Sequence, residues 1–266
     1  MLNTSPRNHL IDRNDRIWQA LVGAAVIAMI VVNALANILP INGVKTGIVS
    51  DGYPSYFVPA GYVFSIWGLI YLGLLVFAAS HALVRAAGAL IAPVRLLFVL
   101  SCLENGVWLI CWHYYQLALS VAVMLTLLLT LIVIYQRLWT AAGSRPSVLV
   151  QLTVLSPISL YLAWICVATI ANVSMLLPTL GWDGWPLSGP TWAAAMMGVA
   201  AVILGWLSLR FSDGIPPLVL GWALFGIVSK FQNQATMRVV GSALAVAMLA
   251  VAIIAFLRRR PSARAV

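Results

Sequence analysis

The stretch YLAWICVATIANV, residues 161–173, decides the fold, because it is an apolar run of helical length with one polar edge. A helix turns about 100° per residue, so four of its positions fall within about 80° of one another: Tyr161, Trp164, Ala168 and Asn172. A phenol or an amide that faces lipid is costly. We therefore expect this edge to face other helices or a cavity.

The composition of the whole chain places this run in a membrane protein. Of its 266 residues, 63% are hydrophobic and only 8% are charged, and the mean hydropathy is +1.02. Soluble domains average about 45–50% apolar and about 25% charged residues. The chain is therefore predicted to be an all-α integral membrane protein, and a soluble domain is excluded.

Eight apolar runs approach the length of about 20 residues that a helix needs to cross the hydrocarbon core. We expect about eight transmembrane helices, at Ile17–Leu39, Gly61–Val84, Val94–Tyr114, Leu117–Leu138, Val148–Leu176, Thr191–Leu209, Pro217–Phe231 and Thr236–Leu257.

The basic residues agree with this count. If both termini are cytoplasmic, twelve of the fifteen basic residues lie on one side: Arg7, Arg13, Arg16, Arg85, Arg95, Arg137, Arg145, Arg210, Arg258, Arg259, Arg260 and Arg264. The other side keeps Lys45, Lys230 and Arg238. This asymmetry is the positive-inside pattern. It predicts a multi-pass protein of a bacterial inner membrane, and the net charge of +9 is assigned to contact with anionic lipids and not to nucleic acid.

Catalytic and metal-binding patterns are missing from the sequence. It has no HExxH, GxSxG or paired intramembrane aspartates. Cys102, Cys111 and Cys166 lie within predicted spans and are expected to be free thiols. We therefore assign no catalytic residue, no metal ligand and no required cofactor.

Two long loops lie on the sparsely charged side. The first, Pro40–Pro59, is rich in turn-forming and aromatic residues that could fold back over the bundle as a lid. The second, Pro178–Pro190, contains Trp182 and Trp185, which are typical of an interfacial aromatic anchor.

Three further spans carry aromatic or amide side chains at helical spacing. These are Asn33 and Asn37 in the first span, Phe64, Trp67 and Tyr71 in the second, and Asn105, Trp108 and Trp112 in the third. The tryptophans of the second, third and fifth spans lie at comparable depths in the half of the membrane beneath the first loop. The sequence therefore predicts either a ligand pocket there or hydrogen bonding between helices with aromatic filling of the core.

Three segments resemble the TspO/MBR family of translocator and tryptophan-rich sensory proteins. PAGYVFSIWGLIY, residues 59–71, resembles its Pro-x-Trp-x-Phe-x-x-x-Trp-x-x-x-Tyr signature in helix two. The run from Glu104 to Trp108 resembles its Leu-Asn-x-x-Trp element in helix three, and residues 161–172 resemble its helix-five Tyr-x-x-Trp-x-x-x-Ala-x-x-Leu-Asn segment. The similarity covers about residues 17–176.

This resemblance implies a five-helix bundle that binds a planar lipophilic ligand such as a porphyrin or a sterol. Carried over by position, the implied ligand-binding residues are Tyr62, Phe64, Trp67, Tyr71, Asn105, Trp108, Tyr161, Trp164, Ala168 and Asn172. The chain then divides into an N-terminal tail (1–16), a TspO-like domain (17–176), a loop (177–190), a three-helix extension that is absent from the five-helix family (191–257) and a basic tail (258–266).

The function implied is that of a membrane-embedded binding, sensory or transport protein, acting as a receptor or carrier. Its partners would be a lipophilic small molecule, membrane lipids and, left open, a second copy in a homodimer. Some family members have been proposed to modify porphyrin oxidatively, so whether this chain is an enzyme stays open. Glu104 replaces an apolar residue of the family and lies within a span. It is the carboxylate of a proton-coupled carrier, a group that contacts an amine or pyrrole nitrogen of the ligand, or a neutral carboxyl bonded to a neighbouring helix, for example to Asn33 or Asn37.

Overall fold

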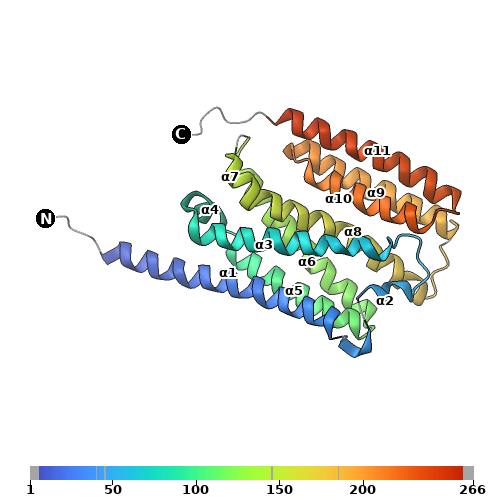
Figure 1. The fold of residues 1–266 in the computed structure, drawn as a ribbon, viewed down its shortest axis with the longest axis horizontal. Helices are drawn as coiled ribbons and strands as arrows, with labels where there is room; N and C mark the ends of the chain where they lie inside the picture. Colours follow the sequence, from blue (N-terminus) through green and yellow to red (C-terminus); the bar gives the residue numbers. More distant parts are fainter. Residues whose placement is uncertain (1–5, 40, 45, 145, 185, 260–266) are drawn as a thin grey trace.

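Long antiparallel helices make up most of the described chain (Figure 1), which we describe from a computed structural model. The described residues are 6–39, 41–44, 46–144, 146–184 and 186–259, without the side chains of residues 6–12 and of Asn37. The long helices are α1 (Pro6–Ile38), α3 (Ile66–Leu83), α5 (Arg95–His113), α6 (Leu117–Ala142), α8 (Ser156–Thr179), α9 (Gly189–Phe211), α10 (Ile215–Lys230) and α11 (Ala235–Arg258).

Within these ranges, seven helical segments are long and apolar enough to cross a membrane. The eighth, α10, has 16 residues and is about 24 Å long at 1.5 Å per residue. The prediction of an all-α membrane protein is confirmed, seven of the eight predicted spans have the required length and hydropathy, and α10 is an apolar helix shorter than the others.

Helix positions agree with the predicted spans, and the differences lie at their ends. The helix α1 begins at Pro6, so residues 6–16, predicted as a tail, are helical; residues 1–5, and 260–266 of the basic tail, lie outside the described residues. The fifth span begins with α7 (Val148–Val150) and a π-helical turn, η3 (Gln151–Leu155), before α8. Pro157 lacks the N–H that would continue regular α-helical bonding into this turn.

Four short helices complete the chain. The loop after α1 contains a 3₁₀ turn, η1 (Ile41–Gly43), and a helix, α2 (Thr46–Asp51). The second span begins with another 3₁₀ turn, η2 (Gly61–Ser65), and α4 (Arg85–Ile91) links α3 to α5. The hydropathy pattern did not predict α2 or α4, because neither is long enough to give a periodic signal.

The helices form two units that share one contact surface. In Figure 1, α1 runs along one flank and α9, α10 and α11 lie side by side along the other, with α3, α6 and α8 between them. The helix α10 packs on α8 and on η2, so it joins the C-terminal helices to the rest of the bundle. The start of α1 and the end of α11 lie at the same end of the bundle, as an even number of spans requires.

The junction between α10 and η2 is close because Gly226 has no side chain. The carbonyl of Gly226 accepts a hydrogen bond of 3.2 Å from the Ala60 amide. The Trp222 indole donates to the Val63 carbonyl at 3.0 Å, and the hydroxyls of Tyr62 and Ser229 share a hydrogen bond of 3.0 Å. These contacts fix the start of the second span, which carries Phe64.

Candidate functional site

Aromatic side chains from three helical segments meet in one cluster, which we call the aromatic cluster. Its members come from η2 and α3, from α5 and from α8; they are Phe64, Trp67, Tyr71, Trp108, Trp112, Tyr161 and Trp164. The i, i+3 and i+7 spacing puts these rings on one face of each helix. The stripes of the second, third and fifth spans therefore converge.

Trp67 is the centre of the aromatic cluster. Its ring centroid lies 5.5 Å from that of Tyr71, in a stacked pair. It lies 6.4 Å from Trp108 at an interplanar angle of 28°, and it meets Trp164 edge-on at 6.4 Å and 86°. Aromatic pairs favour centroid distances of about 4.5–7 Å. The nearly parallel pair of Trp67 and Trp108 is thus at the wide end of that range.

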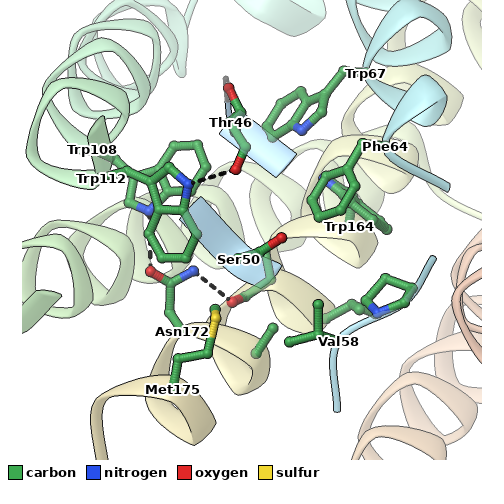
Figure 2. Close-up of a pocket in the computed structure, with 14 residues that line it drawn as sticks. Thr46, Ser50, Val58, Phe64, Trp67, Trp108, Trp112, Trp164, Asn172 and Met175 are labelled. Atoms are coloured by element: carbon green, nitrogen blue, oxygen red, sulfur yellow. Dashed lines mark hydrogen bonds between the residues drawn. The ribbon is translucent and has the colours of Figure 1, made fainter. Parts of the chain in front are cut away.

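A cavity opens between these rings and the loop after α1 (Figure 2). It has a volume of about 470 Å³, including space that is open to the outside, and its wall is almost entirely apolar. The cavity is lined by Thr46, Ser50, Val58, Pro59, Phe64, Trp67, Trp108, Trp112, Trp164, Val167, Ala168, Ala171, Asn172 and Met175. Flat lipophilic ligands suit such a wall, because indole and phenyl rings offer wide apolar faces.

A second cavity shares part of this wall. It has a volume of about 1060 Å³, again including open space, and it also borders Phe64, Trp67 and Trp108. Its other walls come from α1 and α2 and include Asn33, Gly47 and Asp51. The three shared aromatic side chains therefore form a partition between the two cavities.

The polar groups of the stripes are paired between helices. The carbonyl oxygen of Asn172 accepts hydrogen bonds from the Trp108 indole at 3.3 Å and from Ser120 on α6 at 2.9 Å. Its amide donates to the Ala168 carbonyl at 3.0 Å. Asn33 of α1 donates to the side-chain oxygen of Asn105 at 2.8 Å. These bonds are the interhelical hydrogen bonding that the sequence offered as an alternative to a pocket, so both predicted features are present.

Some buried polar atoms at the aromatic cluster lack a hydrogen-bond partner among the described residues. They are the Trp164 indole nitrogen, the Tyr161 hydroxyl and the amide nitrogen of Asn105. An unpaired buried donor costs about 1–3 kcal/mol. Trp164 lines the first cavity, so its N–H can be satisfied there by a ligand acceptor.

The helix α2 covers the mouth of the first cavity, with Thr46 and Ser50 directed toward it in Figure 2. The Trp112 indole donates to the Thr46 carbonyl at 3.1 Å, and the Thr46 hydroxyl lies 3.3 Å from His113 Nε2. At its other end, Asp51 forms an ion pair of 2.6 Å with Lys230 of α10. The loop expected to be a lid therefore bridges α5 and α10.

Nine of the ten implied ligand-binding residues separate into three groups. Phe64, Trp67, Trp108, Trp164, Ala168 and Asn172 line the first cavity, and Tyr71 lines the second. Tyr161, which belongs to the aromatic cluster, and Asn105 are fully buried and line neither of these two cavities.

Tyr62 lies apart from the others. It is 46% exposed and packs edge-on against Trp222 and Phe225 of α10. Two residues of a 3₁₀ turn rotate the chain by about 240°, so Tyr62 cannot share the face of Phe64. The structure thus does not bring Tyr62 to the cavity, and its contacts with α10 hold η2 in place.

Glu104 faces the contact between α5 and α6. Its Oε1 accepts a hydrogen bond of 3.1 Å from Thr130, and its Oε2 is buried without a hydrogen-bond partner among the described residues. Asn33, the neighbour suggested by the sequence, bonds instead to Asn105; the side chain of Asn37 lies outside the described residues. A role for Glu104 in proton coupling stays a prediction.

Sequence reasoning missed the cavity residues contributed by the first loop. Thr46, Ser50 and Val58 line the first cavity, but their spacing follows no helical period that points to a site. The length and turn-rich composition of the loop were the available signal. Trp112 belonged to a predicted stripe and also lines the cavity.

Asn172→Leu is expected to destabilise the bundle by about 1–3 kcal/mol, because it leaves the Trp108 indole and the Ser120 hydroxyl without their shared acceptor. Thermal unfolding in detergent measures this. Ser120→Ala, which removes one of the donors, should cost less alone and should add little to Asn172→Leu. Full additivity of the two changes would contradict the shared bond.

The fold and the cavity define the class as an integral membrane protein of helical spans with an aromatic cavity beneath a loop. A family model described as TSPO-like protein matches residues 19–257. The chain therefore belongs to the family of TSPO-like proteins, which confirms the resemblance inferred from the motifs. The matched residues include α9, α10 and α11. No curated protein and no solved structure matches the chain.

Membership of this family supports a general function as a membrane ligand-binding or sensory protein. Among the residues described, no three His, Cys, Asp or Glu side chains are grouped to hold a metal ion.

Proposed function

We propose that the chain binds a planar lipophilic ligand, such as a tetrapyrrole or a sterol, between its aromatic rings and serves as a binding, sensory or transport protein. The observation that carries this proposal is the nearly parallel pair of Trp67 and Trp108 in an apolar cavity. The unpaired Trp164 indole adds one donor for a polar tip of the ligand.

The small size of the first cavity bears on how a ligand would enter. Phe64, Trp67 and Trp108 occupy the space between the two cavities, so a large flat ring needs these side chains to separate. Trp67 and Phe64 are only half-buried, which leaves them room to change rotamer. Binding then joins the two cavities into one flat slot.

The test is a titration of the purified chain with protoporphyrin, followed by tryptophan fluorescence and by the porphyrin spectrum over time. Saturable quenching with a stable spectrum is the expected result. Loss of the porphyrin bands with new products would instead support the oxidative enzyme. The absence of quenching with both protoporphyrin and a fluorescent sterol would contradict the proposal.

Lys230→Gln is expected to speed porphyrin association several-fold, because it breaks the ion pair that ties α2 to α10. Stability should change little, since an exposed pair contributes about 0–1 kcal/mol. Stopped-flow quenching measures the rate, and Lys230→Arg, which keeps the charge, serves as the control. Unchanged association in Lys230→Gln would show that α2 does not gate the cavity.

For the membrane setting, we propose a bacterial inner membrane with both termini cytoplasmic. The orientation is supported by the twelve-to-three division of basic residues between the two predicted sides of the membrane. The cavity beneath α2 would then open toward the outer face. We also propose that the chain can associate into a homodimer, and mass photometry would measure its oligomeric state.

A further inference from the structure

A separate cavity lies at the end of the bundle away from α2, where α1 begins and α11 ends (Figure 1). It is formed where α6, α9 and α11 end, and its volume is about 840 Å³, including open space. Its lining includes three arginines, Arg210, Arg258 and Arg259, together with Trp139, Phe211 and Ser144. Nothing in the proposed function uses this cavity.

None of the three arginines is ion-paired among the described residues, where the ion pairs join Arg95 to Asp15 and Lys230 to Asp51. Three like charges that border one cavity repel one another, and this cost grows where solvent is partly excluded. An anion in the cavity would remove that repulsion.

Asp213 is the acidic residue near these arginines, but it is already engaged. It is fully buried between α9 and α10. Its two oxygens accept hydrogen bonds from Tyr135 at 3.0 Å and from the Ile215 amide at 3.1 Å. Burial raises the pKa of Asp213 above its ordinary value, which weakens its capacity to neutralise Arg259. The cavity therefore keeps an excess of positive charge.

Arg259 is held in place from several sides. Its guanidinium donates to the side-chain oxygen of Gln151 in the π-helical turn, and it lies 5.1 Å from the centre of the Trp139 ring. Gln151 is in turn fixed by a bond of 3.1 Å to Ser156. Arg210 lies over the Phe211 ring at 5.4 Å. The guanidinium of Arg259 is thus oriented in advance, and the other two arginines of the cavity, Arg210 and Arg258, are exposed.

We propose that this cavity binds a phosphate group through Arg210, Arg258 and Arg259. A guanidinium presents a planar fork of donors that matches two phosphate oxygens at once. The phosphate could belong to an anionic lipid headgroup, because basic pockets between helices at a membrane surface bind such headgroups, or to a soluble phosphate. A purely structural role is the alternative, because a positively charged arginine at the C-terminal end of α9 or α11 also interacts favourably with the helix dipole and so stabilises the helix.

The experiment uses the full chain in phosphatidylcholine nanodiscs. Thermal unfolding is measured with increasing inorganic phosphate, and separately with increasing cardiolipin in the disc; native mass spectrometry counts retained cardiolipin. We expect a saturable rise in the unfolding midpoint with at least one ligand. A rise with cardiolipin alone would assign the site to lipid, and a rise with phosphate would assign it to a soluble anion.

The double variant Arg210→Gln, Arg258→Gln should weaken that ligand by about tenfold or more, because it removes two charge-assisted contacts. Arg210→Lys with Arg258→Lys keeps the charge but loses the fork, and should lose part of the affinity. The matched control is Arg13→Gln with Arg16→Gln on α1, which removes the same charge from exposed positions outside the cavity lining. An equal loss in this control, or no response to either ligand in the unchanged chain, would overturn the proposal.

Discussion

Ala168→Leu is expected to lower the affinity for protoporphyrin by about tenfold or more while leaving the fold intact. Ala168 lines the first cavity together with the rings of the aromatic cluster, one helical turn from Trp164 on α8. A leucine there fills space that a flat ligand needs, and overpacking of this kind costs about 1–3 kcal/mol. In the ligand-free protein the added carbons can occupy the empty cavity, so the loss should appear in binding and not in stability.

The matched control for Ala168→Leu is a second alanine, away from the cavity, that is also replaced by leucine. Ala195 lies on the exposed face of α9 and outside the cavity lining, so Ala195→Leu should leave the affinity unchanged. Both variants are titrated by tryptophan quenching, with the unfolding midpoint recorded in parallel. Unchanged affinity in Ala168→Leu would place the ligand outside the first cavity.

Gly226→Ala is expected to destabilise the protein by about 1–3 kcal/mol and to weaken ligand binding as well. A Cβ at Gly226 would lie 2.1 Å from Val63 Cγ2 and 3.1 Å from Pro59 Cβ. Val63 is fully buried, so relieving the clash must move η2 away from α10. Because η2 carries Phe64, the wall of the cavity would move with it.

Two companion variants make this result specific. Gly221→Ala changes another glycine of α10 whose Cβ would meet nothing within 4 Å, and it should be neutral or slightly stabilising because alanine favours helix. Val63→Ala combined with Gly226→Ala removes the clashing methyl groups and should recover part of the loss. A neutral Gly226→Ala would contradict the close junction of α10 and η2.

The helices could be predicted because hydropathy and length decide where a chain crosses a membrane. All eight runs correspond to described helices, and the even count puts the start of α1 and the end of α11 at the same end of the bundle. Their boundaries were less predictable. The π-helical turn before Pro157 and the short α4 depend on local backbone bonding and packing, which leave little trace in mean hydropathy.

The aromatic cluster was predictable because its residues follow helical spacing, and because the predicted topology gives the direction in which each span crosses the membrane. Trp67, Trp108 and Trp164 were expected at one depth, and their rings do meet around Trp67. Tyr62 lies apart because it was carried over from the family signature by its position, and two residues of either an α-helix or a 3₁₀ turn rotate it away from the face of Phe64. Which neighbour Glu104 bonds to was also beyond the sequence, since that choice depends on the packing of α5 against α6.

The C-terminal helices show what sequence reasoning lacked. Hydropathy predicted them, yet it gave no reason for their presence. In the structure, α10 supports the start of the second span through Gly226 and Trp222 and holds α2 through Lys230. Such contacts join residues that are more than 150 positions apart, so no local pattern announces them. The C-terminal unit therefore positions both the wall and the cover of the first cavity.

The most direct test of the central claim is to locate a bound ligand. A photoreactive porphyrin is bound to the purified chain, irradiated, and its attachment sites are mapped by mass spectrometry, with excess protoporphyrin as competitor. We predict competable labelling of cavity-lining residues within the segments 58–67, 108–112 and 164–175, such as Trp67, Trp108 and Ala168. Competable labelling confined to the exposed faces of α1 or α11 would contradict the assignment of the aromatic cluster as the ligand site.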